Sequence, residues 1–325
     1  MVNLHNNKDV FQEIVEAASS EFNLQPFQVE KDYYVSLFLK NLQEVASNII
    51  FKGGTSLSKC YNVIDRFSED IDLTIYFEED KLTTGALRKS QEPLIAAIKD
   101  TIVKLDFSFL NDEQTEPVYS KRSFNKYKAG YNRIYQGEGE IHMLDHILVE
   151  TTLTYKPYPC EKKLVSNYIT KFLEKEQPEL IKEFDLQPFY MNIQSIDRTF
   201  VDKLFALCDY HHDKDYDRKS RHIYDIHKIY QSGLLNEEEL SSLVGKIIET
   251  RRAGHKTHSC QTGYKPIEAL EDIINSAVFE FDYKTNTREF LSKYVDYETA
   301  IVSLQEILTK GWIPEEIPES PNILV

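Results

Sequence analysis

Residue types that suit phosphate chemistry gather between positions 51 and 73 of the sequence. They form two segments, FKGGTSLSK from Phe51 to Lys59 and RFSEDIDL from Arg66 to Leu73. The glycine pair would let the backbone approach an anion at a strand-to-helix turn. The hydroxyls of Thr55 and Ser56 stand at the helix start, where free N–H groups favour phosphate. We therefore predict a polyphosphate-binding turn, although it lacks the spacing of a Walker A loop.

Asp70 and Asp72 lie two residues apart at the head of a predicted strand, so both carboxylates project from one face. Such a pair can share two divalent cations ~3.5–4 Å apart, which would clamp the attacking oxygen and the leaving pyrophosphate of an in-line displacement. Oxygen-only ligands favour Mg²⁺ or Mn²⁺ over zinc. Alone, an Asp-x-Asp pair is more often a solvated strand end. Here the pair follows a strand and a Gly-Gly-Thr-Ser helix within about 25 residues, and this order favours a metal site.

Charged residues farther along the chain are candidates for the rest of the site. Glu150 stands inside an otherwise apolar run, where an unpaired charge would be costly, and is the candidate third acid. A solvated face of the sheet explains Glu150 equally well. In the C-terminal half, Lys203 and the segment from Arg221 to His227 place charges between apolar helix positions. A cation there could reach a triphosphate across a cleft, but ion pairs within or between helices explain these residues at least as well.

The elements that must position these residues follow from hydrophobic periodicity. Helical spacing predicts helices at 9–22, 26–42, 55–64 and 84–105, and short apolar or alternating runs predict strands at 49–51, 71–76, 107–109, 126–135 and 141–155. After Pro157 and Pro159 the pattern is helical through Leu308, apart from a strand near 189–193. We therefore predict an α+β fold: an N-terminal half with a mixed sheet flanked by helices, then a helical bundle.

Composition limits the class of protein. The chain has 325 residues, and 38 basic against 53 acidic residues give a net charge of −15, which argues against a protein that coats nucleic acid or anionic membrane. Its length suggests about two domains. The four cysteines form no C-x-x-C pair. The sequence shows neither a signal-peptide pattern nor an apolar run of ~20 residues, so we expect a cytoplasmic protein without a membrane partner.

Cations and aromatic rings alternate between Glu116 and Glu138, a stretch that holds no acid. Cations for phosphates and rings for bases are what a single-stranded RNA end requires. The residues are Lys121, Arg122, Lys126, Lys128 and Arg133, with Tyr119, Phe124, Tyr127, Tyr131 and Tyr135. An edge hairpin with outward lysines explains the stretch about as well. Farther on, His255, His258 and Cys260 lack a fourth ligand, so this grouping predicts no zinc site.

The segments around the glycine pair and the two aspartates resemble the signature of the AbiEii/AbiGii-type nucleotidyltransferase toxins. These toxins are a branch of the DNA-polymerase-β-like nucleotidyltransferase superfamily. Four further segments are similar to family motifs: Val29 to Tyr33 to an upstream helix, Leu148 to Glu150 to a third-acid strand, Asp202 to Leu204 to a helical lysine, and Arg221 to Asp225 to the last motif. The resemblance spans roughly residues 25 to 230.

The resemblance implies a fold and a set of site residues. It implies a polymerase-β-like nucleotidyltransferase domain at 1–186 and a helical domain at 187–325 that closes the active-site cleft. The implied metal ligands are Asp70, Asp72 and Glu150, with Lys203 and Asp225 contacting the substrate. The implied triphosphate-binding residues are Gly53, Gly54, Thr55, Ser56, Lys59, Arg66 and Ser68. His222 stands where relatives often have an acid, which leaves the roles of His222 and Asp225 open.

The resemblance also implies an activity. It implies Mg²⁺-dependent transfer of a nucleoside monophosphate from an NTP to an RNA hydroxyl, at a tRNA 3′ end, by the toxin of a toxin–antitoxin or abortive-infection system with an antitoxin encoded nearby. Transfer to a small molecule or a protein hydroxyl is the alternative enzyme, since the same catalytic half serves many acceptors. A non-catalytic nucleotide-binding regulator is a third reading. The sequence alone does not choose the NTP.

Overall fold

A computed structural model describes residues 3–76, 84–111, 124–136, 144–153, 157–252 and 257–320. The chain forms two compact units. The N-terminal unit holds residues 1–62, 67–153 and 160–193, and the helical unit holds 63–66, 154–159 and 194–325. The segment that carries the predicted site therefore changes unit between Arg66 and Phe67.

Seven strands form one sheet in the order β3-β4-β5-β2-β1-β7-β6. Their bounds are β1 Ile49–Lys52, β2 Ile71–Ile75, β3 Ser108–Phe109, β4 Phe124–Gly130, β5 Ile147–Thr152, β6 Cys160–Val165 and β7 Phe189–Gln194. The sheet is mixed, because β2 pairs antiparallel with β1 and parallel with β5, while β4 pairs antiparallel with β5. The central strands β1, β2 and β5 carry β-branched residues that pack into the core.

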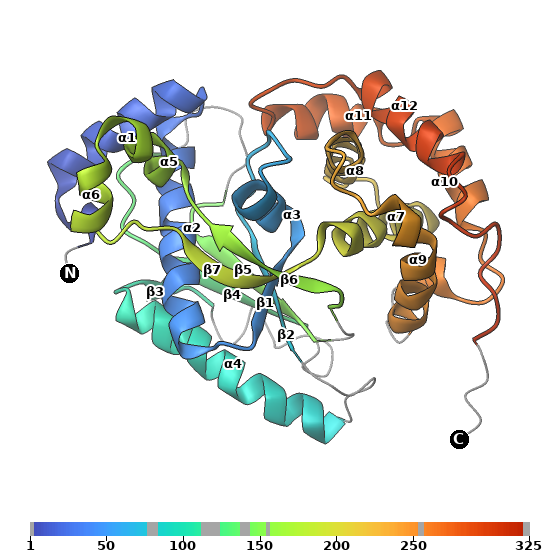
Figure 1. The fold of residues 1–325 in the computed structure, drawn as a ribbon, viewed down its shortest axis with the longest axis horizontal. Coiled ribbons are helices and arrows are strands. Elements are labelled where there is room, and N and C mark those ends of the chain that lie inside the picture. The colour runs from blue at the N-terminus through green and yellow to red at the C-terminus, as the bar shows by residue number, and fades with distance from the viewer. Residues whose placement is uncertain are drawn as a thin grey trace. The chain divides into compact units, whose positions relative to one another are not determined.

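Helix α2 (Pro26–Val45) is the central helix of the N-terminal unit and packs against α1 (Lys8–Phe22), α4 (Thr84–Lys104) and α5 (Tyr168–Glu176) (Figure 1). It begins with Pro26 at its first position and a capping box between Gln25 and Gln28. Most of its length is buried, including three consecutive charged residues. A helix buried on this much of its circumference needs partners for every charge it carries.

The remaining elements of the N-terminal unit are short. They are the 3₁₀ turn η1 (Leu4–Asn6), the one-turn helix α3 (Gly53–Ser56) with the π turn η2 (Leu57–Tyr61), and α6 (Pro178–Glu183). Pro93 lies inside α4, as the sequence predicts. The predicted helix at 55–64 ends earlier, at Tyr61, because Asn62 adopts a left-handed conformation that closes the turn.

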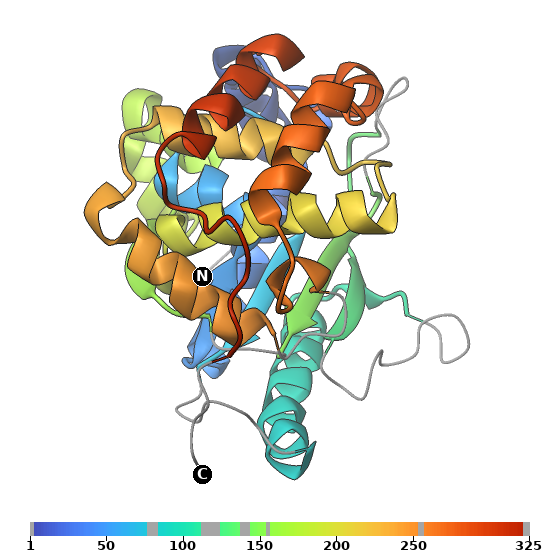
Figure 2. The ribbon, with the colours of Figure 1, turned by 90° about the vertical axis from the view of Figure 1, so that its right-hand side faces the viewer.

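The helical unit, whose helices are coloured yellow to red in Figure 2, is built on α7 (Ile196–Asp213). Helix α7 packs against α8 (Arg221–Gln231), α9 (Glu237–Arg251) and α10 (Pro266–Ser276), and α8 packs against α12 (Tyr297–Leu308). Three short turns complete it: η4 (His258–Cys260), α11 (Glu280–Asp282) and η5 (Tyr283–Thr287). Ser195 caps α7 by accepting a hydrogen bond from the Arg198 N–H.

The predicted α+β class is confirmed. Strand β6 was not predicted, because its sequence Cys160–Val165 is mostly polar and it forms the last strand of the sheet in the order above, where burial is low. Strand β4 ends at Gly130, whereas the prediction continued it to 135. Among the described residues, no helix has both the length and the apolarity to cross a membrane.

Candidate active site

The predicted acids meet on adjacent strands of the sheet. Asp72 on β2 is paired in register with Glu150 on the parallel strand β5, and with Lys52 on the antiparallel strand β1. In both β2 and β5 the neighbouring residues are buried, whereas Asp72 and Glu150 are only half-buried. The two acids therefore project from the same face of the sheet. Asp70, two residues before Asp72, precedes β2.

Gly53 provides the space in which the Asp72 carboxylate lies. Its φ of +80° belongs to the left-handed region, and a Cβ placed on it would stand 2.1 Å from Asp72 Oδ2. Position 53 therefore has no room for a side chain beside the Asp72 carboxylate. Glycine is therefore required at position 53 for two reasons, the left-handed backbone conformation and the close approach of the Asp72 carboxylate.

We expect Gly53→Ala to lower transfer activity by ~10²-fold, because the new methyl group must displace the Asp72 carboxylate by roughly 1 Å or more. Strain from the positive φ would add about 1–3 kcal/mol of destabilisation. Initial rates and urea unfolding measure the two effects. Gly233→Ala is the matched control, since Gly233 also has a positive φ of +67° but no atom within 4 Å of the built Cβ. Equal activity loss in both variants would contradict a role for the Gly53 contact.

Glu150 lies between opposite electrostatic influences. Burial raises its pKa above the ordinary value, the negative charge of Asp72 raises it further, and the ion pair with Lys126 opposes both. Lys126 Nζ is 2.8 Å from Glu150 Oε1. A cation near these acids would relieve the repulsion between Asp72 and Glu150.

The donor set fits a hard divalent cation, because Asp70, Asp72 and Glu150 offer only oxygen. Within the described part of the chain, their carboxylate oxygens do not all lie within 4.8 Å of one another.

The hydroxyl groups of the glycine turn face the protein. Thr55 Oγ1 donates to the Asp70 carbonyl oxygen at 2.5 Å and lies 2.9 Å from Ser68 Oγ. Ser56 Oγ donates to the Gly53 carbonyl oxygen at 2.8 Å, and both Thr55 and Ser56 are buried. These side chains therefore hold the turn and the segment before β2 together. The first N–H groups of a helix have no acceptor within it, so those of the turn are the groups that an anion could bind.

Lys59 is also held inside the protein. Its ammonium group donates to a carboxylate oxygen of Asp32, to the Asp32 carbonyl oxygen at 3.1 Å and to Ser36 Oγ at 2.8 Å. The other Asp32 oxygen accepts the Tyr168 N–H at 2.9 Å. Lys59 is only 3% exposed, so in this structure it binds α2 and no group in solvent.

Three consecutive residues of α2 each bind a different segment. The Glu30 carboxylate accepts the N–H groups of Ile134 and Tyr135 at 2.7 and 3.0 Å, and Asp32 binds Lys59. Lys31, fully buried, donates to the Glu69 carboxylate and to the Leu144 carbonyl oxygen at 2.8 Å. Glu69 directly precedes Asp70. The sequence analysis assigned no role to the segment from Val29 to Tyr33. The feature that indicates one is the run of three charged residues inside an apolar helix.

Three other predicted residues form a buried cluster in the helical unit. Asp225 is fully buried and accepts hydrogen bonds from Arg66 Nε at 2.6 Å and Arg66 Nη2 at 2.7 Å, while Lys203 Nζ lies 2.7 Å from Asp225 Oδ2. Burial would raise the pKa of Asp225, but the two cations outweigh it and hold that pKa below its ordinary value. Arg66, Lys203 and Asp225 are thus brought together, and they bind one another.

His222 lies in the same cluster and is held neutral. Its pKa is far below the ordinary value of 6.5, first because of burial and then because of the charges of Lys203 and Arg221. Its Nδ1 has no hydrogen-bond partner among the described residues. The ring packs edge-on against Tyr210, with centroids 5.3 Å apart.

We expect His222→Phe to flatten the pH dependence of stability between pH 7 and pH 5. A histidine with a depressed native pKa binds its proton only in the unfolded state, so the wild type loses up to ~1.4 kcal/mol for each pH unit below about 6.5, until the native pKa is reached. Phenylalanine keeps the ring contact and removes the titration. Urea unfolding of both proteins across this range measures the difference. Parallel pH curves would show that His222 is not the group responsible.

The basic and aromatic stretch is only partly suited to RNA. Tyr119, Lys121 and Arg122 lie outside the described residues. Tyr127 is buried, and Tyr131 packs against Tyr34 with ring centroids 4.3 Å apart, so these rings belong to the core. Lys126 and Lys128 lie on the half-buried face of β4. Because Lys126 is registered opposite Glu150, Lys126 and Lys128 share the face of the acids.

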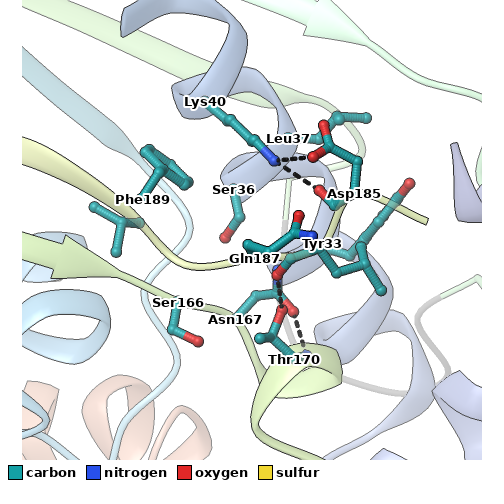
Figure 3. Close-up of a pocket in the computed structure, with 12 residues that line it drawn as sticks. Tyr33, Ser36, Leu37, Lys40, Ser166, Asn167, Thr170, Asp185, Gln187 and Phe189 are labelled. Carbon is teal, nitrogen blue, oxygen red and sulfur yellow. Dashed lines mark hydrogen bonds and ion pairs between the residues drawn. The ribbon is translucent and has the colours of Figure 1, made fainter. Parts of the chain in front are cut away.

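A small cavity beside α2 is shown in Figure 3. The ion pair between Lys40 and Asp185, at 2.9 Å, and the Asn167 cap of Thr170 line it. Its volume of about 20 Å³ has room for roughly one water molecule. The cavity therefore cannot hold a nucleotide.

A mixed sheet with paired acids, beside a turn whose shape requires glycine, is the arrangement that the sequence predicts for a nucleotidyltransferase. The profile of the family described as "Nucleotidyl transferase AbiEii toxin, Type IV TA system" matches residues 37–310, which is most of the chain. The chain belongs to this family and is a nucleotidyltransferase toxin of a type IV toxin–antitoxin system. No curated protein sequence matches it.

Proposed function

We propose that this toxin transfers a nucleoside monophosphate from an NTP to an RNA hydroxyl, at a tRNA 3′ end, with the carboxylates of Asp70, Asp72 and Glu150 binding Mg²⁺ or Mn²⁺. The observation that carries the proposal is the register of Asp72 with Glu150 beside Gly53. The acceptor oxygen forms a bond to the α-phosphorus, and the bond from that phosphorus to pyrophosphate breaks. Divalent cations bound there would neutralise the triphosphate and lower the pKa of the attacking hydroxyl.

The residues of the chain supply position and charge. The N–H groups of Gly54, Thr55 and Ser56 at the start of α3 bind phosphate oxygens, and Gly53 leaves room for them beside Asp72. Thr55 donates to the carbonyl of Asp70 and is itself bonded to the Ser68 hydroxyl, which fixes the backbone that carries the Asp70 side chain. Lys59 acts indirectly, by tying the turn to α2 through Asp32.

Arg66, Lys203 and Asp225 are proposed to hold the segment before Asp70 in place. Arg66 stands four residues before Asp70, and its bidentate pairing with Asp225 fixes the start of that segment. Lys203 shares the same carboxylate. Substrate contact by Lys203 and Asp225, which the family resemblance implies, stays a prediction of the proposal.

RNA is favoured as acceptor by the family and by the lysines of β4. Lys126 and Lys128 lie on the face that carries Glu150, where they can bind the phosphates of an incoming strand. Of the rings expected to stack on bases, Tyr127 is buried and the partly buried Tyr131 packs against Tyr34. Binding of RNA at this face therefore rests on charge, and we expect it to weaken steeply with salt.

Incubation of the purified toxin with each labelled NTP, Mg²⁺ and total tRNA tests the proposal. Label on tRNA, lost after chelation of the metal, is the expected result. Label on protein or on a small molecule in place of tRNA would assign the alternative acceptors. Tight NTP binding with no transfer to any acceptor would identify a non-catalytic regulator. The reading frame next to the gene should encode the antitoxin that the family implies.

A further inference from the structure

A group of metal-ligating side chains that the proposed reaction does not use lies in the helical unit. It consists of His212 and Asp213 at the end of α7 and His258 at the start of η4. One ligand atom from each residue lies within 4.8 Å of the other two. Among the described residues, these are the histidine, cysteine and acidic side chains that converge in this way.

The geometry within the group is specific. The two imidazole rings are stacked, with centroids 4.2 Å apart and planes inclined by 22°. His258 Nε2 lies 3.4 Å from Asp213 Oδ1. Ligand atoms bound to one zinc ion at ~2.0–2.1 Å are about 3.3 Å apart, and each imidazole nitrogen binds in the plane of its ring, so the stacked rings must turn relative to each other to close the group around a metal. The side chains are partly exposed and can make these rotations.

The backbone that carries the ligands is held in place by buried hydrogen bonds. Ser259, next to His258, donates its N–H to Asp209 Oδ1 at 2.8 Å and its hydroxyl to the Phe205 carbonyl oxygen at 3.1 Å. Asp209 is also bound by Arg251 Nη2 at 2.7 Å. Both Ser259 and Asp209 are buried. The fold therefore fixes η4 against α7 one residue after His258 and about one helical turn before His212 and Asp213, which reduces the ordering that metal binding would require.

The charge at this place favours a cation. His212 and Asp213 are the last residues of α7, where the helix carries the negative end of its dipole and its final carbonyl groups are without partners inside the helix. Two imidazoles and one carboxylate are the donor set of Zn²⁺ and other late first-row ions, and not of Mg²⁺, which prefers oxygen ligands. The sequence grouped His258 with His255 and Cys260 and predicted no site there. In the structure Cys260 is buried, His255 lies outside the described residues, and His258 instead lies near two ligands from α7.

We propose that His212, Asp213 and His258 form a binding site for one Zn²⁺ ion or a similar late first-row divalent ion, with water completing its coordination. The ion would join the end of α7 to η4 and so stabilise the helical unit. Because binding to the native state alone adds RT ln(1 + [L]/Kd) to the free energy of unfolding, the unfolding temperature should rise with zinc concentration.

The test uses the full chain without a histidine tag, freed of metal by chelation and dialysis. Zn²⁺ and Co²⁺ are titrated in excess Mg²⁺, so that the carboxylates near Gly53 do not compete. We expect one equivalent bound, visible absorption of Co²⁺ typical of nitrogen and oxygen ligands, and a higher unfolding temperature. His212→Ala and His258→Ala should each weaken binding by more than about 10-fold.

His211→Ala is the matched control, because His211 lies on the same helix but bonds Asp272, 2.8 Å away, and Tyr216. It should bind zinc as the wild type does. Absence of saturable binding would overturn the proposal and leave a stacked pair of rings with an acidic neighbour. Equal zinc affinity in the wild type and in a variant with both His212→Ala and His258→Ala would overturn it as well, since the metal would then sit elsewhere.

Discussion

The Asp72→Asn toxin is expected to lose nucleotide transfer by ~10³-fold or more while its unfolding curve stays close to that of the wild type. Asparagine keeps the size of the side chain but removes the charge that stands beside Gly53 and opposite Glu150. Loss of a charge that would hold a divalent cation removes several kcal/mol of transition-state stabilisation. The Asp72 side chain is half-buried, so the fold does not depend on it.

Initial rates with labelled NTP, measured beside urea unfolding, test this prediction. Asp100→Asn is the matched control, because Asp100 is an exposed aspartate on α4 of the same unit. That variant should transfer at the wild-type rate. A fully active Asp72→Asn or Asp72→Ala protein would remove the metal-binding role proposed for this residue.

The second large effect concerns stability. We expect Asp225→Asn to lower the free energy of unfolding by about 3–5 kcal/mol, because it leaves Arg66 and Lys203 buried without the carboxylate that they share. Asp272→Asn, which alters an exposed pair with His211, should change stability by less than about 1 kcal/mol. Chemical unfolding of the three proteins measures both values.

A double-mutant cycle separates the ion pair from other effects of the substitution. Adding Lys203→Met to Asp225→Asn removes one of the two stranded cations, so the double variant should be more stable than the sum of the single changes predicts. The stabilisation by Asp225 should also depend on pH. Because its native pKa is lower than the ordinary 3.8, this stabilisation is complete above about pH 4 and is lost as the pH falls further. Strict additivity, or an unchanged acid limb in Asp225→Asn, would contradict the account of this cluster.

Much of the fold and the class of enzyme could be predicted because local sequence determines them. The alternation of β2 and the glycine turn before it depend on neighbouring residues, so the sequence predicts Asp70 and Asp72 at the head of β2 and Gly53 at the turn after β1. The role of Glu150 was harder to predict, because the register of the sheet decides which residue of the next strand lies opposite it. In the structure that residue is Asp72.

Contacts between residues that lie far apart along the chain could not be predicted from the sequence. Lys59 reads as a phosphate ligand beside the glycine turn, yet Asp32 of α2 binds it. Tyr127 and Tyr131 read as stacking platforms, yet Tyr127 is buried in the core and Tyr131 packs against Tyr34. Arg66 and Asp225, which the sequence separates widely, form a bidentate pair. In each case tertiary packing decides which of two plausible partners a charged or aromatic side chain meets.

The central claim is that the acids beside Gly53 catalyse attack on the α-phosphorus of an NTP. The most direct measurement compares two labels, an NTP labelled at the α-phosphorus and the same NTP labelled at the γ-phosphorus, each incubated with tRNA and either wild-type or Asp72→Asn toxin. The account predicts α-label on RNA, γ-label in released pyrophosphate, and neither reaction with the variant. Transfer of γ-label to an acceptor, or α-label on RNA with the Asp72→Asn toxin, would contradict it.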